Sequence, residues 1–408
     1  MSRFLFVVPP IAARARPAVS VARELAARGH DVAWTTHHHL LPVGAVVVPA
    51  GPRRRSEGSD VHAMVAAAAA RALRGRRGPA GWIELWDDLL LPLARAMLPA
   101  VHAAVDGFLP DAVVVDQHAL AGAAVAQLHG LPWATLVPSS AGLADPLADL
   151  PAIGGQIRRR SRRFLRDAGL DDVTAARIDP QASPHLVAAF TTEALTGPVD
   201  DPTGRYAFVG PCLDPGLAGR PPLVPFDWGR LDHVHPLVVV TVEAAPWQRG
   251  ARLYALAAQA LASLPVQSAI VGPPDLVPRP PDRMVVVPRA PLRALVRRAA
   301  VVVCDGGQAT VDEALAHGVP LVVAPLVGDQ PTVARQVVRA GAGVAVAPDL
   351  VDAGRLARAV TTALTDRGIQ RGVRRLHDSF ARTGGAMTAG DRLEALLGVR
   401  AVTRNERA

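Results

Sequence analysis

The chain has 408 residues, half of them hydrophobic, and a formal net charge of +8 in which every basic residue other than histidine is an arginine. This length predicts two domains of about 200 residues each. The absence of lysine excludes lysine Schiff-base chemistry and a lysine-dependent phosphate loop. Aromatic residues make up only 4% of the chain, and no nucleic-acid-binding motif is present, so we expect no nucleic-acid partner. We interpret arginine runs such as Arg158–Arg163 as solvated surface.

The cysteine content and the first residues favour a reducing compartment. Cys212 and Cys304 are far apart in sequence and do not indicate a disulfide framework. The chain opens on an apolar run, Arg3–Val8, without a signal-peptide cleavage region, and no apolar run reaches the roughly 18 residues of a membrane span. We therefore expect a cytoplasmic protein with no membrane span.

The first half alternates short apolar runs with helical segments. A strand at Arg3–Val8, a helix at Pro17–Arg28 and a strand at His30–Thr35 form a βαβ unit. The alternation continues with strands at Val46–Val48, Pro110–Val115 and Leu131–Val137 and a helix at Ala119–His129. This order predicts an α/β fold with a doubly wound parallel sheet. An insert at Gly51–Trp82 interrupts it, and we interpret His37, His38 and His39 as a surface loop rather than a metal site.

The second half repeats this organisation after a break. We expect an N-terminal domain over residues 1–211, a proline- and glycine-rich linker over 212–236, a second domain over 237–385, and a C-terminal helix and tail over 386–408. Strands are predicted at Leu237–Val242, Val266–Val271, Met284–Val287, Val301–Cys304 and Leu321–Ala324. This pattern of strands predicts a parallel sheet in the second domain as well.

The most informative segment covers residues 301–346. The apolar run Val301–Cys304 predicts a strand buried on both faces, Gly306 and Gly307 turn the chain, and a helix follows until Gly318. A glycine turn that leads into a helix at the carboxyl end of a parallel strand is a natural anion site. The segment therefore predicts a ligand that carries phosphate.

This segment resembles the donor-binding motif of family 1 glycosyltransferases, the nucleotide-sugar enzymes that decorate natural products in actinomycetes. The family's pattern is matched in order and spacing by Gly306, Gly307, Thr310, Glu313, Ala314, Leu315, Gly318, Val319, Pro320, Asp329, Gln330, Pro331 and Ala334. The resemblance implies the GT-B fold, in which two Rossmann-like domains face across a cleft and the C-terminal helix packs toward the N-terminal domain.

The resemblance also implies a reaction. It implies inverting transfer of a sugar from a UDP- or TDP-sugar to a small acceptor, such as a polyketide or aromatic aglycone, as in antibiotic biosynthesis. It implies no metal and no permanently bound cofactor, and it leaves a homodimer open. It places Gly307 and Thr310 at the diphosphate, Val287 at the nucleobase, and Asp329 and Gln330 at the sugar hydroxyls.

Several donor-site positions depart from the family pattern. Asp305 stands where the family has a phosphate-binding histidine, Ala309 replaces a glycine, and Glu243 follows a strand where the family has a glycine. A carboxylate about 4 Å from a phosphate charge opposes binding by about 4 kcal/mol at an effective dielectric of ~20. A helix N-terminus returns only ~0.3–2 kcal/mol. We therefore hypothesise that Arg14 neutralises Asp305 or Glu243.

The acceptor side departs as well. Arg14 occupies the position of the family's base histidine, and an arginine does not accept a proton near neutrality. Asp116 matches the aspartate that orients that histidine. Three ways to perform the reaction stay open: Asp116 is the base, His118 replaces the lost histidine, or the acceptor is acidic enough to need no strong base. The alternative function is a degenerate or repurposed homologue that binds a metabolite or assists another transferase.

Overall fold

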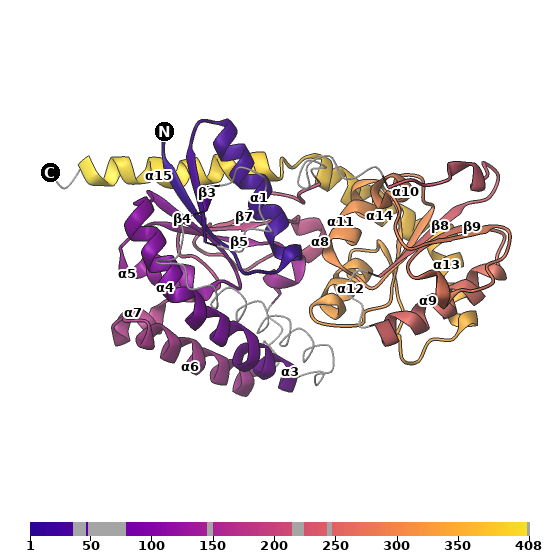
Figure 1. The fold of residues 1–408 in the computed structure, drawn as a ribbon, viewed down its shortest axis with the longest axis horizontal. Helices are drawn as coiled ribbons and strands as arrows, with labels where there is room; N and C mark the ends of the chain where they lie inside the picture. The colour runs from indigo at the N-terminus through magenta and orange to yellow at the C-terminus, as the bar shows by residue number, and fades with distance from the viewer. Residues whose placement is uncertain (36–45, 48–78, 145–149, 214–223, 243–246, 406–408) are drawn as a thin grey trace. The chain divides into compact units, whose positions relative to one another are not determined.

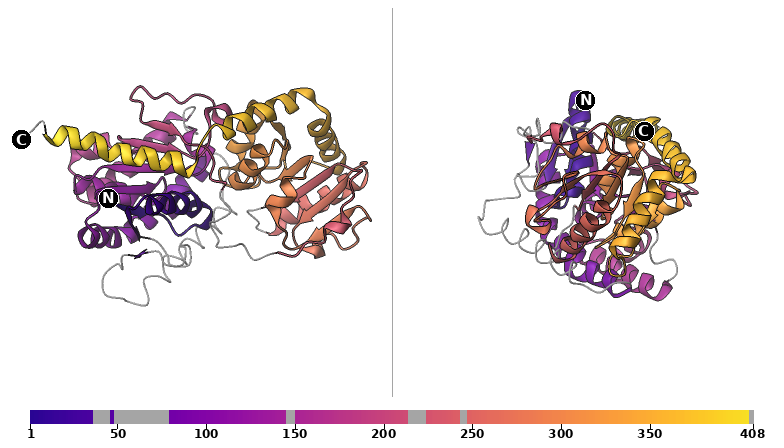
Figure 2. Two further views of the ribbon diagram at one scale, coloured as in Figure 1. Left: turned by 90° about the horizontal axis from the view of Figure 1, so that it is seen from above. Right: turned by 90° about the vertical axis from the view of Figure 1, so that its right-hand side faces the viewer.

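The computed structural model describes residues 1–35, 46–47, 79–144, 150–213, 224–242 and 247–405. Two compact units divide the chain (Figures 1 and 2): unit 1 comprises Met1–Phe190, Val199–Gly219 and Thr383–Ala408, and unit 2 comprises Thr191–Pro198 and Arg220–Arg382. Residues 191–198 thus group with unit 2, although the sequence placed them in the N-terminal domain. Glu243, His37–His39 and most of the insert lie outside the described residues.

Unit 1 is built on a parallel sheet of seven strands in the order β3-β2-β1-β4-β5-β6-β7. The strands are β1 Arg3–Val7, β2 Asp31–Thr35, β3 Val46–Val47, β4 Ala112–Asp116, β5 Trp133–Val137, β6 Leu186–Ala189 and β7 Tyr206–Phe208. The central strands are apolar on both faces because helices cover both sides of the sheet. The predicted parallel sheet of the first half is confirmed.

Helices cover the two faces of this sheet and are visible around it in Figure 1. One face carries α1 Ala12–Ala27 and α15 Ala386–Asn405, and the other carries α4 Leu91–Phe108 and α5 Leu120–Leu128. Outside α4 and α5 pack α3 Pro79–Glu84, the π-helix η2 Leu85–Leu90, α6 Pro151–Asp167 and α7 Asp172–Arg177. A short turn, η3, spans Ser140–Leu143. Side chains alternate along β1: Phe4 and Phe6 pack in a cluster with α1 and α15, while Leu5 and Val7 pack with α4 and α5.

One helical run of unit 1, Gly81–Phe108, has the length and mean hydropathy of a membrane-crossing helix, although the sequence suggested no such run. In this run 44% of the most apolar window is buried. Leu93, Met97 and Val101 belong to the core beneath the sheet, and Trp86 and Leu90 to a second core against α6. Among the described residues, these apolar side chains of Gly81–Phe108 therefore pack in the protein core.

Unit 2 contains a parallel sheet of six strands in the order β10-β9-β8-β11-β12-β13. The strands are β8 Leu237–Thr241, β9 Gln267–Val271, β10 Met284–Val287, β11 Val301–Cys304, β12 Leu321–Val323 and β13 Gly343–Ala345. The helices are α8 Glu193–Thr196, α9 Trp247–Ala262, α10 Leu292–Val296, α11 Gln308–Ala316, α12 Gln330–Arg339, α13 Ala353–Thr365 and α14 Arg367–Ala381, with short turns η4 Trp228–Arg230 and η5 Pro274–Leu276. Both units therefore have a doubly wound sheet in which the fourth strand lies beside the first.

The C-terminal helix α15 is held to unit 1 by charge as well as by apolar contacts. Arg28, at the end of α1, donates to Asp391 and Glu394 on α15, each at 2.7 Å, and to Glu24 on its own helix at 2.9 Å. His30 contacts Glu394 at 2.7 Å. Ala389 and Leu393 pack into the core that α1 shares with the sheet. The last helix is thus an integral layer of unit 1.

Candidate active site

Both sheets place a buried aspartate at the carboxyl end of the fourth strand. Asp116 is the last residue of β4, and Asp305 directly follows β11. Asp116 is 1% exposed and Asp305 is 0% exposed. The carboxyl ends of parallel strands are where open α/β sheets bind their ligands. These two positions therefore define the candidate site of each unit.

In unit 1, Arg14 forms an ion pair with Asp116. Arg14 lies in the first turn of α1, and its Nε donates to Asp116 Oδ1 at 2.8 Å. The same oxygen accepts the backbone N–H of His118 at 2.8 Å. Asp116 Oδ2 and Arg14 Nη2 are buried and have no hydrogen-bond partner among the described residues. Strands β1 and β4 are neighbours in the sheet, so the segments that follow them meet.

The burial of this cluster shifts two ionisation equilibria. Burial raises the pKa of Asp116 above its ordinary value, and the Arg14 guanidinium opposes that shift. Burial also lowers the pKa of His118 well below 6.5, and the nearby positive charge of Arg14 adds to the effect. The His118 imidazole is therefore neutral at pH 7. The structure brings Arg14, Asp116 and His118 together at the carboxyl edge of this sheet.

The partner of Arg14 differs from the one we hypothesised. Its Nε donates to Asp116 of the same unit at 2.8 Å. Glu243 lies outside the described residues. The Asp305 carboxylate accepts hydrogen bonds from residues of unit 2.

In unit 2, the Asp305 carboxylate is held by amide groups. Gln330 Nε2 donates to Asp305 Oδ2 at 2.7 Å, and the Gly307 backbone N–H donates to Oδ1 at 3.2 Å. Gln330 Oε1 in turn accepts the backbone N–H groups of Leu326 and Val327, both at 2.9 Å. Gln330 thus ties the turn after β11 to the loop after β12. Its side chain is 3% exposed, so it holds these loops rather than presenting its amide at the surface.

The remaining donor-side residues surround this turn. Gly306 has a φ of +88°, a left-handed conformation that favours glycine, and Thr310 is buried in the first turn of α11. Asp329 is exposed at the N-cap position of α12 but makes no side-chain capping bond. Val287 ends β10, and its carbonyl accepts the Gly272 N–H at 2.9 Å.

Sequence reasoning found these residues but missed how they are linked. Motif alignment assigned Asp305 and Gln330 to separate ligand contacts, and Arg14 to a partner in the other half of the chain. The missed signal is the strand order. Parallel neighbours β11 and β12 bring the segments after Cys304 and Val323 together, as β1 and β4 do for Arg14 and Asp116.

Comparison with known proteins agrees with this geometry. A family described as the C-terminal domain of erythromycin biosynthesis protein CIII-like proteins matches residues 271–396. The chain is 28% identical to 4'-demethylrebeccamycin synthase from Lentzea aerocolonigenes, over 97% of this chain and 100% of that protein. It is 27% identical to demethyllactenocin mycarosyltransferase from Streptomyces fradiae, over 97% of this chain and 87% of that protein.

Solved structures show the same fold. The calicheamicin glycosyltransferase CalG4 superposes with a TM-score of 0.72 at 22% identity, over 98% of this chain and 99% of that chain. The glycosyltransferase of kitacinnamycin superposes with a TM-score of 0.70 at 23% identity, over 97% of this chain and 98% of that chain. With its two doubly wound parallel sheets, the chain has the GT-B fold, and its sequence is similar to glycosyltransferases of natural-product biosynthesis.

Proposed function

We propose that this cytoplasmic enzyme transfers a sugar from a nucleoside diphosphate sugar to a small natural-product acceptor, with inversion at the anomeric carbon. The cluster of Arg14, Asp116 and His118 at the carboxyl edge of the unit 1 sheet carries the proposal. Relatives support the donor class: the glycosyltransferase VinC was solved in complex with DTDP, and the spinosyn rhamnosyltransferase SpnG was solved with thymidine diphosphate. TDP-sugars are therefore the first donors to test.

The turn at Gly306 and the start of α11 form the diphosphate site of this proposal. A helix N-terminus favours an anion. The left-handed conformation of Gly306 favours glycine, so no side chain stands between the turn and the ligand. The Asp305 charge is buried and hydrogen-bonded by Gln330 and Gly307, so it does not face the diphosphate as an exposed carboxylate. Thr310 lines the helix start, Val287 contacts the nucleobase through its backbone, and the exposed Asp329 receives sugar hydroxyls.

His118 is the proton acceptor in our proposal. Asp116 Oδ2 is buried, and Oδ1 is engaged by Arg14 and by the His118 backbone, whereas the His118 side chain is half-buried. The imidazole is neutral at pH 7 and so is in the correct state to accept a proton. The acceptor oxygen forms its bond to the anomeric carbon as the bond to the diphosphate breaks, and the acceptor proton passes to the His118 ring.

Arg14 and Asp116 position this base. Asp116 pairs with the guanidinium and fixes the backbone of His118. Burial, with a smaller contribution from the Arg14 charge, keeps the imidazole from being protonated before the acceptor arrives. The low pKa makes His118 a weak base, so the proposal favours acceptors with an acidic hydroxyl or N–H group.

Titration with TDP and UDP, followed by turnover with TDP-sugars, tests the function. We expect micromolar binding of TDP and turnover that His118→Gln lowers by about 10²–10⁴-fold, the usual range for a general base. Arg14→His, which restores the family residue, should retain or increase turnover. No binding at millimolar nucleotide, together with no turnover, would overturn the proposal.

The pH profile of the rate distinguishes deprotonation of the acceptor by His118 from ionisation of the acceptor by itself. Because the pKa of His118 lies well below 6.5, the rate should rise with pH only below that value and stay flat between pH 6.5 and 8. An acceptor that ionises by itself would instead give a rate that follows its own pKa. His118→Gln should then leave the rate unchanged, which would remove His118 from the mechanism.

A further inference from the structure

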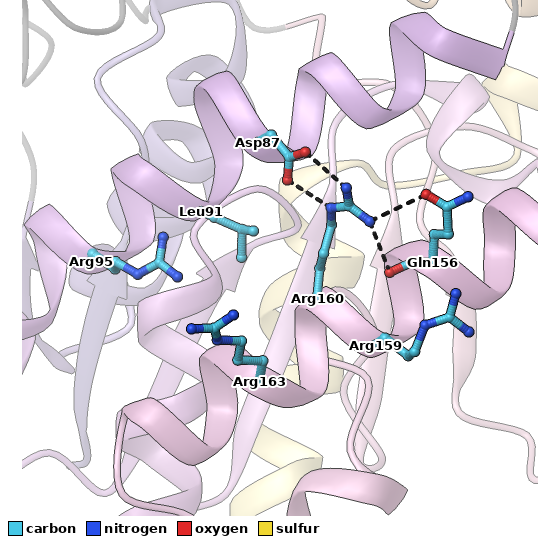
Figure 3. Close-up of a pocket in the computed structure, with 7 residues that line it drawn as sticks. All are labelled: Asp87, Leu91, Arg95, Gln156, Arg159, Arg160 and Arg163. Atoms are coloured by element: carbon cyan, nitrogen blue, oxygen red, sulfur yellow. Dashed lines mark hydrogen bonds and ion pairs between the residues drawn. The ribbon is translucent and has the colours of Figure 1, made fainter.

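A groove on unit 1 is lined mainly by arginines and shares no residue with the candidate active site. It has a volume of about 420 Å³ and lies between α6 and the η2–α4 segment (Figure 3). Four arginines line it together with the acidic Asp87 and the apolar Leu91: Arg95, Arg159, Arg160 and Arg163. We call this the arginine groove. The transfer mechanism proposed above does not use it.

Arg160 is the fixed part of the arginine groove. Its Nε and Nη2 donate to the two oxygens of Asp87 at 2.7 and 3.0 Å, a two-point contact that joins α6 to η2. Its Nη1 reaches the backbone and side-chain oxygens of Gln156, both at 3.5 Å (Figure 3). The charge of Asp87 is therefore committed to Arg160 and is not left facing the other arginines.

Arg95 and Arg163 are held only loosely. Arg95 Nη2 lies 3.9 Å from Asp167 Oδ2, and Arg163 Nε lies 4.0 Å from the same oxygen, so neither contact is a hydrogen bond. Their side chains are 52% and 76% exposed. Figure 3 shows these two guanidinium groups on one side of Arg160 and that of Arg159 on the other. The rim thus presents donors from two directions.

The arrangement of charge on α6 is unfavourable in the absence of a ligand. Arg159 and Arg163 are four residues apart, and like charges at that spacing repel each other on a helix. The opposite face of α6 is already committed to the core through Ile157, Phe164 and Leu165. A bound anion would remove this repulsion, which gives the groove a physical preference for negative charge.

The chemistry of the arginine groove selects the ligand class. Its four guanidinium groups face two carboxylates, Asp87 and Asp167, so the local net charge is +2. Guanidinium forks match the oxygens of phosphate, and arginine is more weakly hydrated than lysine. Leu91 and the arginine stems supply apolar surface beside the charges. We propose that the arginine groove binds a small phosphorylated organic molecule, with the phosphate on Arg95 and Arg163 and a second anionic group on Arg159.

Calorimetric titration of the full chain with pyrophosphate tests the site. The double variant Arg95→Gln/Arg163→Gln should bind pyrophosphate at least tenfold more weakly than the wild type. The matched control is Arg158→Gln/Arg162→Gln, which removes the same charge from exposed positions of α6 that do not line the groove. We expect the control to change the affinity less than twofold. Equal losses in both variants, or no loss in either, would overturn the proposal.

Two further arms make the outcome specific. Vesicles containing phosphatidylglycerol distinguish a lipid headgroup from a free phosphorylated molecule, and we expect no groove-dependent cosedimentation. Capture by such vesicles that the double variant abolishes would overturn the small-molecule assignment. If the double variant does not fold, Arg159→Gln with Arg158→Gln as its neighbour control gives the same comparison. The variants lie outside the proposed transfer site, so loss of transferase activity would not be confused with loss of this site.

Discussion

The two sheets hold a buried aspartate at the same place in opposite ways. Asp116 of unit 1 and Asp305 of unit 2 both lie at the carboxyl end of the fourth strand of a doubly wound sheet, and both are almost completely buried. Asp116 is balanced by a full positive charge on Arg14, whereas Asp305 is balanced by the amide groups of Gln330 and Gly307.

We propose that this difference separates a reactive position from a structural one. Asp116 has one buried oxygen with no hydrogen-bond partner among the described residues, and its neighbour His118 carries a strongly perturbed pKa. Both oxygens of Asp305 accept hydrogen bonds that fasten two loops. Perturbed ionisation beside unsatisfied polar atoms is typical of functional sites. We therefore propose that the same fold position serves chemistry in unit 1 and loop geometry in unit 2.

Removing the charge partner in unit 1 should produce the largest effect. Arg14→Leu leaves Asp116 buried without its cation, and we expect a loss of about 3–5 kcal/mol in the free energy of unfolding at pH 7. Urea unfolding of the variant and the wild type measures this. Arg16 is exposed and lies two residues further along α1, so Arg16→Leu should alter the free energy of unfolding by less than about 0.5 kcal/mol.

The loss should depend on pH with a defined sign. Without Arg14, burial is opposed only by the His118 N–H hydrogen bond among the causes acting on Asp116, so its folded-state pKa rises further above 3.8. A carboxyl group whose pKa is higher in the folded state than in the unfolded state destabilises the folded state as pH rises through the interval between the two pKa values. The difference between variant and wild type should therefore shrink as pH falls toward 4. A difference that is the same at pH 4.5 and pH 7 would contradict an ion-pair role for Arg14.

The amide-held aspartate of unit 2 should respond less strongly. Gln330→Ala removes the donor to Asp305 and the acceptor for the Leu326 and Val327 N–H groups, and we expect a loss of about 2–3 kcal/mol. Hydrogen exchange should show faster exchange at the Leu326 and Val327 amides. Gln370→Ala is the matched control, because the Gln370 side chain makes one bond, to the Ala363 carbonyl at 3.1 Å. A loss under 1 kcal/mol for Gln330→Ala would remove it from the loop scaffold.

Sequence reasoning predicts the strands of this molecule better than the partners of its charged residues. Apolar runs such as Val301–Cys304 identify buried parallel strands directly, because both faces are covered. The glycine turn at Gly306 was likewise readable from the sequence. The ion pair of Arg14 and the loop-holding role of Gln330 were not, because each depends on which strands are neighbours. Motif alignment gives a residue its position in a family but not its hydrogen-bond partner in this chain.

The turn after β11 offers the finest comparison, because it needs a left-handed residue and the turn after β4 does not. Gly306 has a φ of +88°, and a Cβ added there would lie 2.9 Å from Val323 Cγ1. Gly318 has a φ of +70°, but a Cβ added there would have no atom within 4 Å. Gly306→Ala should therefore lower the unfolding free energy by about 2 kcal/mol, from backbone strain plus crowding, and Gly318→Ala by about 1 kcal/mol, from strain alone. Thermal unfolding of both variants measures the difference. Equal losses would show that Val323 moves aside, and that the turn beside Asp305 is set by backbone conformation rather than by packing against β12.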